Sequence, residues 1–304
     1  MSVERASAGE VELAYETFGN REDLPLLLVM GLATQMLGWQ EDFCRGLADR
    51  GLFVIRFDNR DIGLSTHLDD SPPGDVVAAF GGDTSSAAYT LSDMARDTVG
   101  LMDALGLDGV HLVGASMGGM IAQTVAIEHP ERVRSLTSIM SRTGEEGVGD
   151  ATEEATQVLL RPPAGNREEA IEGTLATYRV IGSPGFELDE PALRERAALS
   201  YDRAYDPAGI SRQLVAIAAS GDRTEGLKRL DVPTLVIHGA EDPLIQVSGG
   251  RATAEAVPGA ELVVFDGMGH DVPRALWPEI TDRIASLVER GESLRQDAAG
   301  ARAG

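Results

Sequence analysis

One serine of this chain stands where its hydroxyl could act as a nucleophile. Ser116 is flanked by Gly114 and Gly118, with an apolar strand-like segment before it and an apolar helix-like segment after it. A serine at such a sharp strand-to-helix turn sits on strained backbone, and its hydroxyl is pushed clear of the sheet. The two glycines remove side chains that would collide at the turn. An ordinary glycine-rich turn explains less of this context, so the pattern predicts a nucleophile elbow.

The chain also holds the two partners that a serine nucleophile needs. A serine hydroxyl requires a base at neutral pH, and the base requires a carboxylate that orients it. For a serine on this type of turn, the acid and then the histidine follow later in the chain. Asp242 comes after an apolar run and is followed by Pro243, and His270 stands in a Gly-x-Gly-His loop after the next apolar run. We therefore expect a triad of Ser116, Asp242 and His270.

Other residues could fill two of these roles. Three further carboxylates lie near enough in sequence to supply the acid: Glu241, Asp266 and Asp271. We favour Asp242 because Pro243 stops the chain there and fixes the loop. Of the five histidines only His270 follows the acid. His238 ends a strand before it and is interpreted as a packing or supporting residue, whereas His111 begins a strand at the opposite end of the sheet.

The negative charge that forms on the carbonyl oxygen in the transition state needs hydrogen-bond donors. One is expected to be the backbone N–H of Met117, the residue after the nucleophile. The other should come from the loop after the apolar run at residues 26–30. We assign it to the N–H of Leu32, with Gly31 permitting the turn. The alternative is that Gly31 is a simple strand-end glycine.

Strand and helix patterns alternate along the chain and would bring these residues to one edge of a sheet. Apolar runs predict strands at residues 11–18, 26–30, 52–57, 110–114, 133–140, 234–238 and 261–265. Apolar stripes predict helices at residues 39–47, 91–105, 117–128, 250–256 and 275–289, the second of them opened by a capping box at Thr90 and Asp93. Repeated strand–helix units predict a mostly parallel, doubly wound α/β sheet. Ligands bind at the carboxyl ends of the strands in such sheets.

This alternation is interrupted in the middle of the chain. Amphipathic helical stretches at residues 153–160, 167–180, 190–199 and 210–219, punctuated by prolines, replace the strand signals. We therefore expect a helical cap at residues 143–230, inserted between core segments 1–142 and 231–290. Residues 68–89 are irregular and could form a mobile loop near the mouth of the site. The polar, Ala/Gly-rich residues 291–304 are expected to be a flexible tail.

The composition is that of a globular protein with an acidic surface. Of 304 residues, 43% are hydrophobic and 25% charged, and the net charge of −23 argues against binding of nucleic acid or anionic membranes. The single cysteine, Cys44, precludes an internal disulfide and is interpreted as a buried apolar residue. Residues 1–6 lack the features of a signal peptide, and the apolar run at residues 24–32 is too short to span a bilayer. We expect a cytoplasmic monomer or homodimer.

Together these motifs resemble the α/β-hydrolase superfamily. Its nucleophile, acid and base positions are matched by Gly114-x-Ser116-x-Gly118-Gly119, Gly239-x-x-Asp242-Pro243 and Gly267-x-Gly269-His270. More narrowly, residues 27–31, 37–39 and 54–65 are similar to those of the anthracycline methylesterases, such as those that act on aclacinomycin. The resemblance covers nearly the whole chain and implies an α/β-hydrolase fold and hydrolysis of a carboxylic ester.

Two departures lie beside the expected oxyanion loop. Met30 replaces the histidine of the common His-Gly pair, as in the methylesterase subgroup, and Leu32 stands where that subgroup has a second glycine. These two departures are expected to reshape the pocket beside the oxyanion loop. The substrate of the methylesterases therefore cannot be assigned to this protein from the resemblance. We expect a serine esterase that acts on a small, largely hydrophobic substrate through an acyl-enzyme, with no metal or organic cofactor. The alternatives are a hydrolase of lactone, C–C or peptide bonds, a perhydrolase, or a non-catalytic receptor on the same fold.

Overall fold

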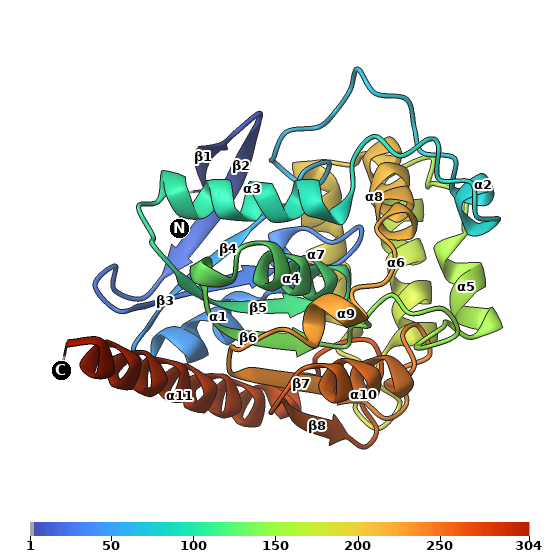
Figure 1. Cartoon of the computed structure of the whole chain (residues 1–304). Coiled ribbons are helices and arrows are strands. Elements are labelled where there is room, and N and C mark those ends of the chain that lie inside the picture. Colours follow the sequence, from blue (N-terminus) through green and yellow to red (C-terminus); the bar gives the residue numbers. More distant parts are fainter. Residues whose placement is uncertain (1–2, 304) are drawn as a thin grey trace.

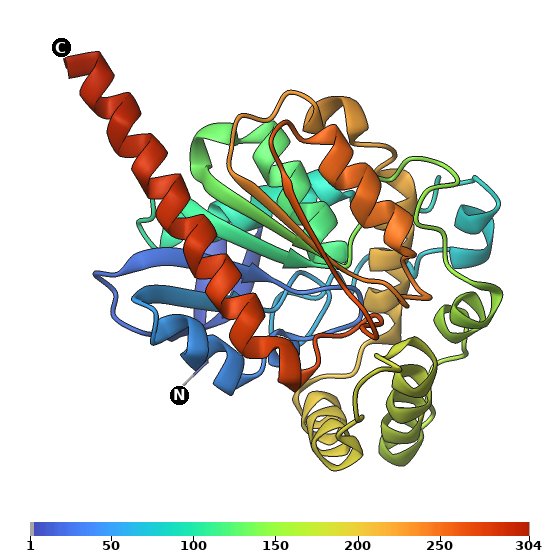
Figure 2. The ribbon, with the colours of Figure 1, turned by 90° about the horizontal axis from the view of Figure 1, so that it is seen from below.

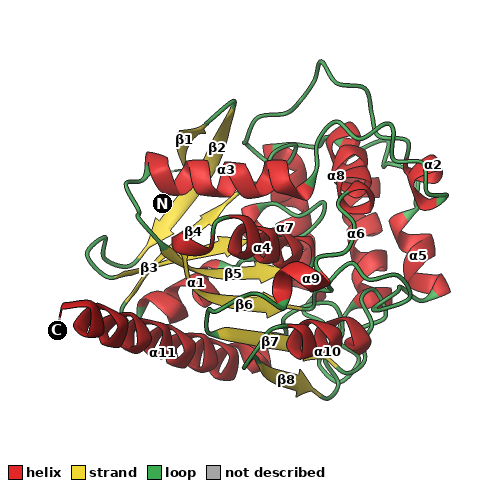
Figure 3. Cartoon of the chain, in the orientation of Figure 1, coloured by secondary structure: helices red, strands yellow, loops and turns green. Residues whose placement is uncertain are grey.

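A computed structural model, which describes residues 3–303, contains one eight-stranded sheet (Figures 1 and 3). Its strands are β1 (Glu4–Ala8), β2 (Val11–Phe18), β3 (Leu24–Val29), β4 (Leu52–Phe57), β5 (Val110–Ala115), β6 (Val133–Ile139), β7 (Thr234–Gly239) and β8 (Glu261–Phe265). They lie in the order β1-β2-β4-β3-β5-β6-β7-β8. The first two pair antiparallel, and all strands from β4 to β8 run parallel. The predicted mostly parallel sheet is confirmed.

Helices cover both faces of this sheet. The α-helices of the described residues are α1 (Glu41–Ala48), α2 (Val76–Phe80), α3 (Leu91–Ala104), α4 (Met117–Glu128), α5 (Glu153–Leu159), α6 (Arg167–Ile181), α7 (Glu190–Arg203), α8 (Pro207–Ala219), α9 (Thr224–Leu227), α10 (Val247–Ala256) and α11 (Trp277–Ala303). One face carries α3, α4 and α10, and the other carries α1 and α11, which pack together (Figure 2). The sheet is therefore doubly wound.

The sequence explains why the central strands form where they do. Every residue of β4, β5 and β7 is buried, as expected for apolar runs covered by helices on both faces. Strand β1 was not predicted, because its sequence Glu-Arg-Ala-Ser-Ala lacks an apolar pattern. It forms as an edge strand through pairing with β2. Cys44 is buried in the α1 face, and burial raises the pKa of its thiol to about 12, so it is a poor nucleophile.

Helices α5 to α8, here called the inserted helices, lie between β6 and β7 in sequence. They fall inside residues 143–230, where a helical cap was expected. Figure 1 shows them beyond the carboxyl ends of the parallel strands. Helices α6 and α7 pack on each other through an apolar cluster of Ile171, Leu175, Leu193 and Ala197. Residues 68–89, expected as an irregular loop, contain the short helix α2, which Asp75 caps by accepting a hydrogen bond from the Ala78 N–H.

Helix α11 continues through Ala303, into the residues 291–304 for which a flexible tail is expected. Gly291 lies so close to the start of β6 that a Cβ there would be 2.9 Å from the Arg134 carbonyl oxygen. The next residue, Glu292, lies 3.3 Å from Nε2 of the buried His111 and 3.5 Å from Arg134. These contacts dock the helix beyond the point where its apolar stripe ends. Of the described helices, none combines the length and apolar character needed to cross a bilayer.

Candidate active site

Ser116 occupies the strand-to-helix turn between β5 and α4. Its backbone has φ 56° and ψ −122°, a conformation that non-glycine residues rarely adopt. A Cβ on Gly114 would lie 2.1 Å from the Gly118 carbonyl oxygen, and a Cβ on Gly118 would lie 2.1 Å from that of Val29. Only glycine fits at either position, so these contacts explain the spacing of the motif. The residue therefore has the strained backbone expected of a nucleophile elbow.

The three residues of the expected triad form one hydrogen-bonded line. His270 Nε2 lies 2.9 Å from Ser116 Oγ, and its Nδ1 lies 2.7 Å from Asp242 Oδ2. An ionised carboxylate only accepts hydrogen bonds, so Nδ1 carries the proton and Nε2 is left to accept from the serine hydroxyl. The other carboxylate oxygen, Asp242 Oδ1, accepts the N–H groups of Leu244 and Ile245, both at 2.9 Å. These bonds fix the acid in the loop after β7.

The alternative residues occupy other positions. Glu241 accepts a hydrogen bond from the Gly267 N–H, Asp271 accepts one from Ser183, and Asp266 is exposed. His238 is buried, and its Nε2 lies 2.7 Å from the Ile245 carbonyl oxygen but 3.6 Å from Asp242. Burial lowers the pKa of His238, so the neutral ring supports the acid loop.

The two residues expected to supply the oxyanion donors lie beside Ser116. Met117 is the first residue of α4, so no helical carbonyl four residues earlier is there to accept its N–H. A Cβ on Gly31 would be 3.0 Å from Ser116 Cβ, which places the loop after β3 directly against the serine. Leu32 follows in that loop, and Ala33 after it has φ 57°. Both Leu32 and Met117 line the same cavity as Ser116 and His270.

This cavity has a volume of about 1170 Å³ and lies between the sheet edge and the inserted helices. Its lining is largely apolar and includes Tyr178, Leu193, Leu214 and Ile217 of these helices. Charged groups also line it, and most have a polar partner: Arg142 pairs with Asp150, Arg274 pairs with Asp42, and Asp271 accepts a hydrogen bond from Ser183. Arg196 lies over the ring of Tyr178, 5.6 Å from the ring centroid, and has no ion-pair or hydrogen-bond partner within residues 3–303. It is therefore a free hydrogen-bond donor at the cavity wall.

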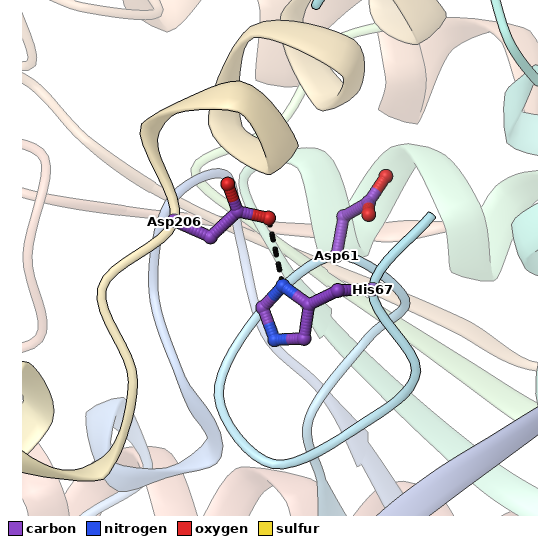
Figure 4. Close-up of side chains that lie close together, drawn as sticks. All are labelled: Asp61, His67 and Asp206. Carbon is purple, nitrogen blue, oxygen red and sulfur yellow. Dashed lines mark hydrogen bonds and ion pairs between the residues drawn. The ribbon is translucent and has the colours of Figure 1, made fainter. Parts of the chain in front are cut away.

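A second cluster of chemically active side chains joins the core to α8 (Figure 4). His67 Nδ1 lies 2.7 Å from Asp206 Oδ2, and its Nε2 lies 3.0 Å from the Gly63 carbonyl oxygen. Asp61 comes close enough to make a three-ligand metal site geometrically possible. Arg212 of α8, however, donates to both carboxylate oxygens of Asp61, at 2.7 and 2.9 Å. The possible metal ligands are thus already bonded to other protein groups. We interpret the cluster as a fastening, that is, a set of polar contacts that holds α8 to the core.

We expect this fastening to depend on pH. Desolvation lowers the pKa of His67, but its bonds to Gly63 and Asp206 outweigh that effect and raise the pKa above the usual 6.5. The protonated ring therefore stabilises the fold fully below pH about 6.5, and this contribution is lost as pH rises through the raised value. Urea unfolding of wild type and His67→Gln at about pH 5.5 and about pH 8.5 should show a larger difference at the acid pH.

The pKa of the neighbouring Asp61 is lowered and that of Arg212 is raised, so both stay charged across that interval and do not imitate the effect. His129→Gln is the control, because that ring makes no hydrogen bond within the described residues. A difference between wild type and His67→Gln that is equal at both pH values would contradict the assignment.

Sequence reasoning missed the polar residues that hold the loops around the site. Asp58 accepts the Met36 N–H at 2.7 Å and pairs with Arg203 of α7 at 3.0 Å. Gln213 of α8 is fully buried and bonds the Ala33 N–H. The only feature of the sequence that pointed to them was a run of polar residues that begins at Asp58, directly after β4. The ion-pair partner of Asp58, Arg203, lies 145 residues further along the chain, so no local pattern could identify it.

Comparison with known proteins agrees with this architecture. A sequence model of the alpha/beta hydrolase fold family matches residues 25–273. The chain is 29% identical to rhodomycin D methylesterase DauP of Streptomyces sp. (strain C5), over 94% of this chain and 98% of the relative. It is also 29% identical to 3-oxoadipate enol-lactonase 2 of Acinetobacter baylyi, over 86% and 87%. The solved esterase RhEst1 of Rhodococcus sp. ECU1013, 24% identical, shares the fold with a TM-score of 0.69 over 94% of this chain and 100% of that one.

The resemblance to anthracycline methylesterases expected from the motifs is confirmed by the first of these relatives. The match of the family model extends from β3 to the loop after His270, and thus spans the elbow, the inserted helices and the acid and histidine loops. The chain therefore belongs to the α/β-hydrolase fold family.

Proposed function

We propose that this protein hydrolyses a carboxylic ester of a small, largely hydrophobic substrate, with Ser116 as nucleophile, His270 as base and Asp242 as the residue that orients the base. The observation that carries the proposal is the continuous line of hydrogen bonds from Ser116 to Asp242 at the wall of an apolar cavity. Methylesterases and an esterase among the similar proteins support the same class of reaction.

In the proposed mechanism, Ser116 Oγ attacks the ester carbonyl carbon while His270 Nε2 takes the hydroxyl proton. Asp242 stabilises the resulting imidazolium. The N–H groups of Leu32 and Met117 donate to the oxygen that becomes negative in the tetrahedral intermediate. That intermediate collapses as His270 returns the proton to the leaving alcohol, which leaves an acyl-enzyme. A water molecule, activated by the same histidine, then releases the acid and restores Ser116.

The cavity supports a proposal about the substrate. A volume of about 1170 Å³ lies just above the usual range of small-molecule pockets and suits a bulky, apolar acyl group. The unpaired Arg196 would donate to an acceptor oxygen on that group, with Tyr178 beside it. The net charge of −23 should disfavour anionic substrates mildly and in a salt-dependent way. We therefore propose a small-alcohol ester of a bulky, neutral, oxygen-bearing acid.

A substrate panel tests this proposal. We expect kcat/KM to be highest for short-chain p-nitrophenyl esters and methyl esters of polycyclic acids, and lower for lactones, long-chain lipids and dipeptides. A fluorophosphonate probe should label Ser116 in the same preparation. Fastest turnover of lipids or dipeptides would overturn the substrate class but not the triad. If panel compounds bind but none is turned over, and the probe does not label Ser116, the protein would instead be a receptor.

A further inference from the structure

The side chain of Gln213 joins an inserted helix to two loops of the core. It lies on α8 and is 0% exposed. Its Oε1 accepts the Ala33 N–H at 3.1 Å, and its Nε2 donates to the Arg60 carbonyl oxygen at 2.9 Å. The first loop follows β3 and contains Leu32, and the second follows β4. One amide thus satisfies a donor and an acceptor on two core loops that lie 180 and 153 residues away in sequence.

The loop bonded by Gln213 contains a residue in an unfavourable backbone conformation. Ala33 has φ 57°, in the left-handed region that costs a residue with a Cβ about 1 kcal/mol or more. The Ala33 N–H belongs to the peptide that begins at the Leu32 carbonyl, so a bond to it fixes the orientation of that peptide. The Thr34 N–H lies 3.4 Å from the Gly31 carbonyl oxygen, too long to fix the turn by itself.

Gln213 itself does not line the cavity, whereas Leu32 and Ala33 do. A substrate in the cavity therefore contacts the loop and not the glutamine. Any effect of Gln213 on the reaction must then pass through the loop. We propose that Gln213 is a positioning residue, which aims the Leu32 N–H at the developing oxyanion by fixing the Leu32–Ala33 peptide. This inference rests on the proposed function, because it assigns Leu32 N–H a role in ester hydrolysis.

The proposal makes the inserted helices part of the catalytic apparatus as well as the roof of the cavity. A donor that is displaced by about 1 Å stabilises the transition state poorly but leaves ground-state binding nearly unchanged. Gln213→Met keeps the length of the side chain and removes both hydrogen bonds. We expect it to lower kcat by about 10- to 100-fold, less than the loss of an oxyanion donor itself, with KM within about threefold of wild type.

A boronic acid separates positioning from general damage to the fold. It forms a tetrahedral adduct with Ser116 whose oxygen occupies the oxyanion site, so its inhibition constant in Gln213→Met should rise by the same factor by which kcat falls. Gln213→Glu retains an acceptor for the Ala33 N–H and should recover part of kcat. Gln123→Met is the matched control, because Gln123 is also 0% exposed but bonds Ser138 and Arg223 in the core.

The outcomes are distinct. Loss of kcat with a parallel loss of boronate affinity, absent from Gln123→Met, supports the proposal. Wild-type kcat in Gln213→Met, a change confined to KM, or equal losses in the two methionine variants overturns it. If Gln213→Met does not fold, Gln213→Asn, whose shorter amide cannot reach both loops, takes its place under the same criteria. Wild-type protein without Ser116-dependent ester hydrolysis overturns the proposed function itself, a result that the Gln213 variants cannot produce.

Discussion

Replacing Ser116 with alanine is expected to lower kcat for ester hydrolysis by about 10⁴- to 10⁶-fold while folding and ligand affinity stay close to wild type. The change removes one hydroxyl whose hydrogen bond in the structure is to His270 Nε2. Within the described residues no other hydroxyl is hydrogen-bonded to His270 Nε2, so no neighbouring side chain can replace Ser116 as nucleophile. Steady-state kinetics with a p-nitrophenyl ester and thermal unfolding of the same samples provide the measurement. His270→Ala should match the loss, because base and nucleophile act as a unit.

The chain offers an internal control for this result. Ser135 Oγ lies 2.8 Å from Nδ1 of His111, whose Nε2 is 3.3 Å from Glu292, so serine, histidine and carboxylate meet again near the opposite ends of β5 and β6. His111 and Ser135 are 0% and 2% exposed, and no substrate can reach them. Ser135→Ala should leave kcat unchanged. Retention of even about a tenth of wild-type activity by Ser116→Ala would disprove the assignment of the nucleophile.

Replacing Arg212 with methionine is expected to lower the free energy of unfolding by about 3–5 kcal/mol. The side chains of Arg212 and Asp61 are 2% and 0% exposed, and two hydrogen bonds join them. Although desolvation alone would raise the pKa of Asp61, the bond from Arg212 lowers it, so the carboxylate is charged at neutral pH. Without the arginine a buried charge has lost its main partner. Urea denaturation followed by circular dichroism measures the loss.

Two further variants identify the cause of that loss. Arg167→Met removes an exposed bidentate pair with Asp202 on the inserted helices and should leave stability nearly unchanged. The double variant Asp61→Asn with Arg212→Met removes the charge together with its partner, and should regain part of the stability lost in the single variant. If Arg212→Met were no less stable than Arg167→Met, the buried pair would not fasten α8 as we infer.

Sequence patterns predicted the core of this fold closely because its signals are local. Strands β2, β4 and β8 match their predicted ranges residue for residue, and α3 begins after Thr90 with the predicted capping box. The positions of Ser116, Asp242 and His270 could also be predicted, since each follows a strand at the same edge of a parallel sheet. Their catalytic roles and that of Leu32 stay predictions until the variants are measured.

Other features could not be predicted, because tertiary contacts decide them. Strand β1 exists through its partner β2, and Gly291 and Glu292 of α11 dock against the start of β6 and His111. Neither contact leaves a periodic signal in the sequence. The same holds for Gln213, which in the sequence is one polar residue on an amphipathic helix. Its importance comes from the two loops that it reaches.

The buried ion pairs that hold α7 and α8 to the core, Asp58–Arg203 and Asp61–Arg212, affect how substrate enters and product leaves the cavity. Lifting these two helices would strip buried Asp58 and Asp61 of their arginines, and each such loss costs about 3–5 kcal/mol. A conformer opened in that way would make up less than about one molecule in a hundred. Passage is therefore expected beside α2, a short helix at the cavity wall whose Val77 and Phe80 are 79% and 59% exposed. Where release of the acid limits turnover, displacement of this short helix, and not of α7 and α8, would set the rate.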